Sequence, residues 1–146
     1  MAKSFSQLSF RLAFMNRQEE ARQATLEAVQ LYRSLAEVDP EASNQDLAQS
    51  LDDLARYGSA LGDREGALRA IEEAVELRQS LAKVHHEEFN PHFAQSLNGL
   101  GIHAWAFGRR EEGTKAAEKA FELYQSLAKV HPDIFNPDLA LSLNNL

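Results

Sequence analysis

Cysteine is absent from this chain of 146 residues, and proline, methionine and tryptophan are scarce, with 4, 2 and 1 residues. The lack of cysteine excludes disulfides, thiolate metal ligands and a cysteine nucleophile. It is typical of a reducing compartment, so we expect a cytoplasmic protein. No apolar run approaches the ~20 residues that cross a bilayer, so we expect no membrane segment.

An excess of basic charge is also missing, because the formal net charge is −7 with neutral histidines. Proteins that bind nucleic acid need a basic stripe, and this chain has only short basic pairs such as Arg109-Arg110. We therefore expect neither nucleic acid nor an anionic membrane as a partner. A basic or neutral peptide is easier to accommodate.

The sequence contains no recognisable catalytic motif. It has no Gly-rich phosphate loop, no His-Glu-x-x-His pattern and no nucleophile–base pairing. One cluster has the residue types of metal ligands: His85, His86, Glu87, Glu88 and His92. Its spacing is not that of a known zinc site, and a solvated connector explains it more simply. We expect no enzyme activity, no metal and no cofactor.

What the sequence does contain is a copy of itself at an offset of 46 residues. Between residues 46–91 and 92–137, 24 of 46 positions are identical. The run Gln-Ser-Leu-Ala-Lys-Val-His occurs unchanged at 79–85 and 125–131. The same offset matches the first part of the chain more weakly. A fixed period of this length is typical of stacked-repeat architectures.

Each repeat is predicted to be a pair of helices. In the second repeat, residues 46–62 and 64–84 place apolar side chains at helical spacing. Between them, Gly62 favours a left-handed turn and Asp63 can cap the following helix. Small residues stand where the two helices of a repeat would cross closely: Ala67, Ala74, Gly113 and Ala120.

The connector between the second and third repeats is placed at residues 85–91. Here Asn90 can act as the N-cap of the next helix, and Pro91 suits its first turn because the missing N–H costs nothing there. The sequence thus predicts an all-α chain, a single α-solenoid domain over residues 1–146 with seven helices. Its repeats are 1–45, 46–91, 92–137 and a partial fourth repeat at 138–146.

These residues resemble tetratricopeptide repeats. The matching positions are Leu54-Ala55, Gly62-Asp63, Ala67 and Ala74, then Leu100-Gly101, Gly108-Arg109, Gly113 and Ala120. The family's usual period is 34 residues. The longer period and the closing stretch at 131–146 look like the long repeats of kinesin light chains. The resemblance implies a non-catalytic scaffold for protein–protein interaction.

The resemblance also implies that the first helices line a concave binding face. Carried over position by position, this face includes Gln49, Asp52, Arg56, Gln95, Asn98, Ile102, Trp105 and Asn144, with Phe10 and Phe14 as further apolar anchors. The polar members suit the backbone of an extended peptide, and Trp105 and Arg56 are of the types that dominate binding energies.

Two alternatives stay open for these positions. Trp105 can instead fill space between the second and third repeats, and Asn98 and Asn144 can bridge neighbouring first helices. A carboxylate clamp is disfavoured, because it needs Lys and Asn where this chain has Arg56 and Ile102.

Residues 138–146 restate only the opening of a repeat, which predicts a fragment of a longer array; a natural short protein with an imperfect cap is the alternative. Exposed terminal helices would favour self-association, so a homo-oligomer is the second functional reading.

Overall fold

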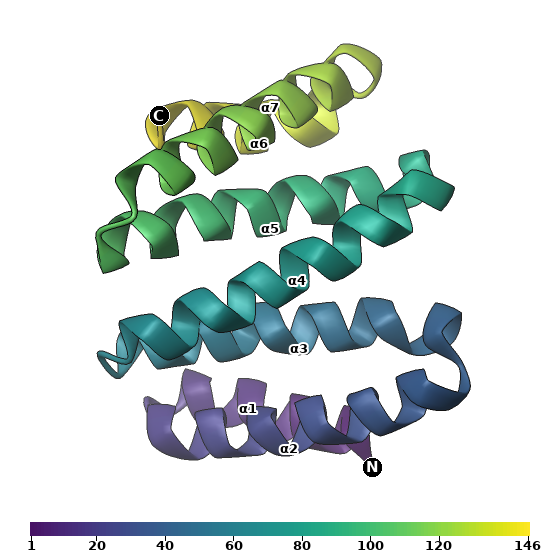
Figure 1. The fold of residues 1–146 in the computed structure, drawn as a ribbon, viewed down its shortest axis with the longest axis vertical. Coiled ribbons are helices and arrows are strands. Elements are labelled where there is room, and N and C mark those ends of the chain that lie inside the picture. The colour runs from purple at the N-terminus through teal and green to yellow at the C-terminus, as the bar shows by residue number, and fades with distance from the viewer. The chain divides into compact units, whose positions relative to one another are not determined.

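The computed structural model describes residues 1–146 and contains seven α-helices and no strand (Figure 1). The helices are α1 (Ala2–Phe14), α2 (Gln18–Val38), α3 (Pro40–Ala60), α4 (Arg64–Val84), α5 (His86–Phe107), α6 (Arg110–Val130) and α7 (Pro132–Asn144). The consecutive helix pairs α1–α2, α2–α3, α5–α6 and α6–α7 pack against each other, which agrees with the predicted all-α repeat fold with seven helices.

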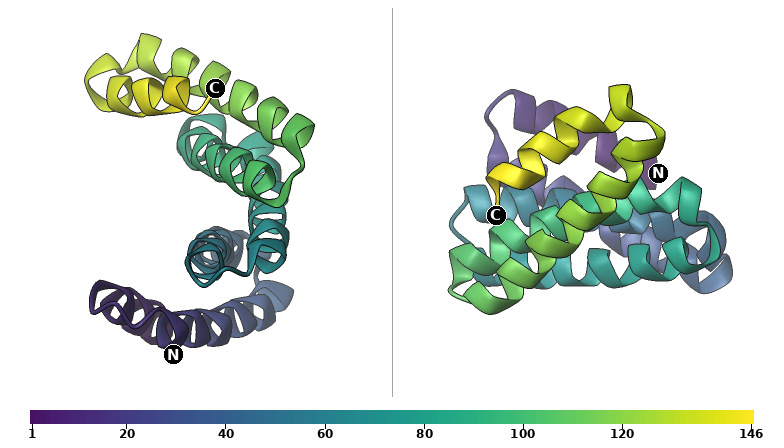
Figure 2. Two further views of the ribbon diagram at one scale, coloured as in Figure 1. Left: turned by 90° about the vertical axis from the view of Figure 1, so that its left-hand side faces the viewer. Right: turned by 90° about the horizontal axis from the view of Figure 1, so that it is seen from above.

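The chain forms two compact units, Met1–Leu77 and Arg78–Leu146, and the division falls within α4. In the first unit, α2 packs against both α1 and α3. In the second unit, α6 packs against both α5 and α7, and α7 returns beside α6 at the C-terminal end (Figure 2). The boundaries of the sequence repeats stay predictions.

The turn inside each helix pair repeats with the same backbone geometry. Asn16, Gly62 and Gly108 all have positive φ, at 60°, 85° and 100°. The next residue donates its N–H to a carbonyl five residues earlier, and this N···O distance is 2.8 Å in all three turns. Glycine adopts such a conformation without steric cost, and asparagine tolerates it. The left-handed turn predicted at Gly62 is thereby confirmed.

The start of α4 also follows the prediction. Asp63 accepts a hydrogen bond from the Gly66 N–H at 2.9 Å, so its carboxylate caps the helix. The same carboxylate pairs with Arg22 of α2 at 2.8 Å. In the other two repeats the matching residues are Arg17 and Arg109, and neither makes a side-chain cap hydrogen bond.

Small residues allow the helices of a pair to approach closely, as the sequence predicted. Ala74 and Ala120 are fully buried, and Ala67 is 1% exposed. A Cβ added to Gly101 would lie 3.2 Å from the Gly113 carbonyl oxygen, which is tighter than ordinary contact. Side chains larger than alanine would therefore force α5 and α6 apart.

The predicted connector at residues 85–91 is wrong. Helix α5 begins at His86 with His85 as its N-cap, so Asn90 and Pro91 lie inside the helix. Starting earlier places the acidic Glu87 and Glu88 in the first turn, where the helix dipole favours them. It also buries Phe89 to 8% exposure. Together these gains offset the hydrogen bond that a proline removes within a helix.

One buried layer differs between repeats. Tyr32, Arg78 and Tyr124 occupy matching positions, with exposures of 5%, 0% and 5%. Arg78 donates hydrogen bonds to Ser96 Oγ at 2.7 Å and to the His92 carbonyl oxygen at 3.2 Å. A fully buried guanidinium thus stands where the other repeats bury a phenol.

The phenols of this layer lie in a low-dielectric setting. Burial, with a smaller contribution from the charge of Asp138, raises the pKa of Tyr124 to about 12. Burial also raises the pKa of Tyr32, although a hydrogen bond with Ser6 opposes the shift. Ser142, the match of Ser96, is fully buried, and its hydroxyl has no hydrogen-bond partner.

Candidate interaction face

The structure distributes the residues predicted to bind a peptide over both units. Gln49, Asp52 and Arg56 lie on α3 in the first unit; Gln95, Asn98, Ile102 and Trp105 lie on α5, and Asn144 on α7, in the second. None of the eight is buried. Each unit therefore presents its own part of the first-helix face, and a role of these residues in binding stays a prediction.

In the first unit, the face has an aromatic hollow between α1 and α3. Its volume is about 240 Å³, and its lining is Phe10, Ala13, Phe14, Gln18, Arg56, Tyr57 and Ala60. Phe10 and Phe14 are 67% and 88% exposed. Such exposure of two large apolar side chains on one helix is typical of an interaction surface.

Arg56, which lines this hollow, is held in place by two contacts. The Arg56 guanidinium lies 2.7 Å from Asp53 and 5.3 Å from the centre of the Tyr57 ring. Tyr57 is 3% exposed and belongs to a core cluster with Leu12 of α1. Arg56 is thus oriented by a carboxylate and by a ring that the fold itself fixes.

In the second unit, Trp105 and Ile102 are 48% and 51% exposed on α5. One edge of the indole lies directly over Gly113 of α6, at the space a Cβ would need. The Arg110 guanidinium lies 5.4 Å from the ring centre. Trp105 therefore combines a packing contact within its own repeat with a large exposed surface.

An amide bridge links α5 and α7, but it does not use Asn144. Asn145 Nδ2 donates to Asn98 Oδ1 at 3.1 Å, while Asn144 is exposed. The predicted bridging of first helices by asparagine therefore occurs with the neighbouring residue. The side-chain carbonyl oxygen of Asn98 is the acceptor of this hydrogen bond.

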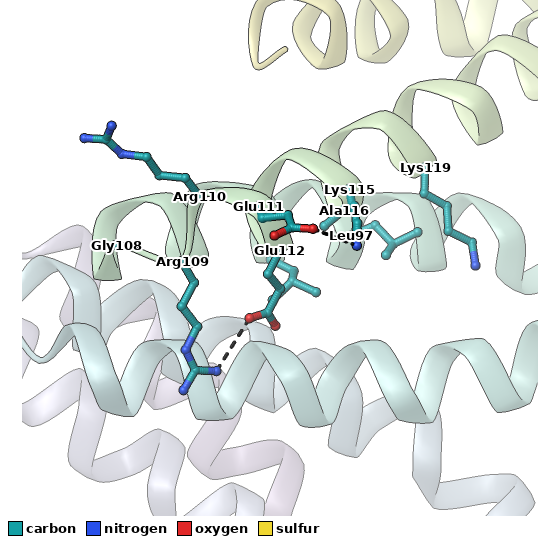
Figure 3. Close-up of a pocket in the computed structure, with 10 residues that line it drawn as sticks. Leu97, Gly108, Arg109, Arg110, Glu111, Glu112, Lys115, Ala116 and Lys119 are labelled. Atoms are coloured by element: carbon teal, nitrogen blue, oxygen red, sulfur yellow. Dashed lines mark ion pairs between the residues drawn. The ribbon is translucent and has the colours of Figure 1, made fainter.

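A hollow of about 900 Å³ lies between α5 and α6 (Figure 3). Leu97, Leu100 and Ala116 are among its apolar lining residues. In the first unit, the matching positions on α3 and α4 line a hollow with Leu26 and Val29 of α2. The repeat thus identifies this hollow as a helix-packing surface rather than a ligand site.

Sequence reasoning missed a second hollow, of about 350 Å³, where the ends of α5, α6 and α7 meet. Its apolar lining includes Leu123, Leu127, Val130, Ile134 and Phe135. The sequence did contain a sign of this hollow, since the helical spacing of apolar residues continues through Val130. The hollow was missed because residues 85–91, which line part of it, were predicted to be a connector and not the start of a helix.

The histidines form no metal centre, since no group of three or more His, Cys, Asp or Glu side chains is arranged to hold an ion. Burial lowers the pKa of His103. Burial and then the nearby Arg78 lower the pKa of His92, against the charge of Glu88. Neither histidine pairs with a nucleophile. No helix is long and apolar enough to span a membrane.

Paired helices joined by left-handed turns, with small residues at each crossing, define a helical repeat protein. Residues 47–88 match the family model of the tetratricopeptide repeat, so this segment of the chain is similar to a tetratricopeptide repeat. Such repeats are in general protein–protein interaction modules, and their fold is typically non-catalytic. A comparison with curated proteins gave no match. The closer likeness to kinesin light chains stays a prediction.

Proposed function

We propose that this chain is a non-catalytic scaffold, located in the cytoplasm, that binds a peptide or protein segment on the exposed faces of its first helices. The observation that carries the proposal is the exposure of large apolar side chains on those faces. Phe10, Phe14, Ile102 and Trp105 are all between 48% and 88% exposed.

The test begins with selection of 12-residue peptides from a random displayed library on the immobilised chain. Affinities of the selected peptides are then measured by fluorescence anisotropy for the chain and for Trp105→Ala and Arg56→Ala. Truncation of a central aromatic anchor typically costs at least ~2 kcal/mol, which is roughly a 30-fold loss of affinity.

Arg69→Ala is the matched control. Arg69 is an exposed arginine on α4, paired with Glu65 at 3.6 Å, and lies outside the first-helix face. It should leave affinity unchanged. If both Trp105→Ala and Arg56→Ala bind every selected peptide as tightly as the control does, the first-helix face is not the binding surface.

The second candidate function is self-association through α7. Leu143 is 57% exposed, whereas its counterparts Leu51 and Leu97 are 1% and 5% exposed. We propose that a second copy can cover this face. Sedimentation across a wide concentration range tests it: Leu143→Glu should abolish any dimer, while Leu35→Glu, at a leucine 51% exposed on α2, should not. A monomer at all concentrations removes this candidate.

A further inference from the structure

Trp105 and Arg110 form a preorganised pair at the turn between α5 and α6. The indole edge rests over Gly113, and the guanidinium lies 5.4 Å from the ring centre. A guanidinium that stacks on a ring keeps its N–H groups at the edge of its plane, where they can bind a carboxylate in a bidentate manner. The contact with the ring therefore orients Arg110 and leaves its N–H groups able to bind a carboxylate.

The other charges of this turn are paired with each other. Arg109 lies 3.5 Å from Glu112, and Lys115 lies 3.2 Å from Glu111. Figure 3 shows Arg110 pointing away from both pairs. Among the charged residues of this turn, Arg110 is therefore the one whose described partner is an aromatic ring and not a carboxylate.

The pair is specific to the third repeat. At the matching positions, the second repeat has Ser59 and Arg64, and the first has Ala13 and Gln18. An arginine thus recurs at this point of the second repeat, but only the third provides the tryptophan that orients it. The first and second repeats have Ala21 and Ala67 where the third has Gly113, so one edge of the indole takes the place of their methyl groups while the rest of the ring stays exposed.

We propose that Trp105 and Arg110 bind an acidic residue of a partner segment, with the carboxylate on Arg110 and the neighbouring apolar side chain on the exposed indole. This inference rests on the proposed function and adds the chemistry of the partner. It departs from the preference for a basic or neutral peptide that the net charge of −7 suggests. Contact charges within ~4 Å outweigh a distributed net charge, which salt screens beyond ~10 Å.

The experiment uses peptides from the displayed random library, resynthesised in two forms. One form keeps every Asp and Glu, and the other replaces them by Asn and Gln. Each form is titrated against the full chain, Arg110→Gln and Arg64→Gln. Arg64→Gln is the control, because this arginine has the same repeat position and Ser59 stands where the third repeat has Trp105. Trp105 is the chain's single tryptophan, so its emission reports directly on contact.

We expect the peptides that depend on Trp105 to be enriched in Asp and Glu. Arg110→Gln should weaken the acidic form about tenfold or more, as loss of a charged hydrogen bond implies, and should leave the amide form unchanged. Arg64→Gln should change neither form. The Arg110 effect should also shrink at high salt.

Two results would overturn the inference. If peptides bind in a Trp105-dependent manner without acidic residues, or if Arg110→Gln weakens both forms equally, the acidic partner is refuted while the proposed function stands. If no selected peptide depends on Trp105 or Arg56, both proposals fail. Unchanged thermal unfolding of each variant ensures that a lost contact, and not a lost fold, is measured.

Discussion

Replacing Ser96 and Ser142 separately by alanine offers a sharp test of how the buried layer is stabilised. The two serines hold matching positions in the repeat, and both are buried, at 1% and 0% exposure. Ser96 Oγ accepts a hydrogen bond from the buried Arg78 at 2.7 Å. The Ser142 hydroxyl has no partner.

The expected magnitudes follow from this difference. A hydrogen bond to a charged group contributes about 1.5–3 kcal/mol, and Ser96→Ala removes the acceptor of one. An unsatisfied buried hydroxyl costs about 1–3 kcal/mol, so Ser142→Ala should be neutral or stabilising. Both substitutions gain the same small helix propensity of alanine, which cancels in the comparison. Ser96→Ala should therefore be less stable than Ser142→Ala by roughly 2 kcal/mol or more.

Urea-induced unfolding followed by circular dichroism measures both variants against the parent chain. The slope of the unfolding free energy with urea should be unchanged, since neither substitution alters the surface exposed on unfolding. The reasoning is refuted if the two variants lose equal stability, or if Ser142→Ala is the more destabilised. Either outcome would mean that the Arg78–Ser96 hydrogen bond does not stabilise the fold.

Three further predictions concern the same core and its crossings. Arg78→Tyr, which inserts the residue of the other two repeats, should keep or raise stability. Arg78→Ala should leave a cavity and lower stability by about 2–5 kcal/mol in the same urea assay, and equal losses for the two variants would contradict this. Gly113→Ala should displace Trp105 and cost about 1–3 kcal/mol, read from a shift of tryptophan emission, and an unshifted spectrum would count against the close contact. Because the pKa of His103 is lowered in the fold, its contribution to stability is present above the unfolded pKa of ~6.5 and is lost as pH falls through the folded pKa, so His103→Gln should flatten the pH dependence of thermal unfolding.

The repeat made much of the fold predictable. Gly62 made the turn of the second repeat predictable because few other residues accept a positive φ, and Asp63 made the start of α4 predictable through its cap. The helix starts were not predictable by the same local rules. Proline is common in the first turn of a helix, so Pro91 predicted a helix start at that point. The helix instead starts at His86, which buries Phe89. Tertiary packing overrode a local preference there.

The candidate site was predictable only in part. The periodicity placed Arg56 and Trp105 on first helices correctly, because helical spacing determines which side chains share a face. It could not reveal that Arg56 contacts the Tyr57 ring or that Arg110 contacts the Trp105 ring, since both contacts depend on side-chain conformations. Nor could it show that Arg78 is fully buried, because arginine is rarely fully buried and its sequence position therefore predicts an exposed side chain.

The identical turns have a consequence for how such a chain can change length. The segment from Arg17 to Gly62 and the segment from Asp63 to Gly108 each begin just after one left-handed residue and end on the next, so both begin and end on the same backbone geometry. Removing residues 63–108 would join Gly62 to Arg109, and the new junction would reproduce the hydrogen-bonded turn found at Gly108. Gain or loss of whole 46-residue segments by recombination therefore preserves every junction, while the insertion of a single residue disrupts one.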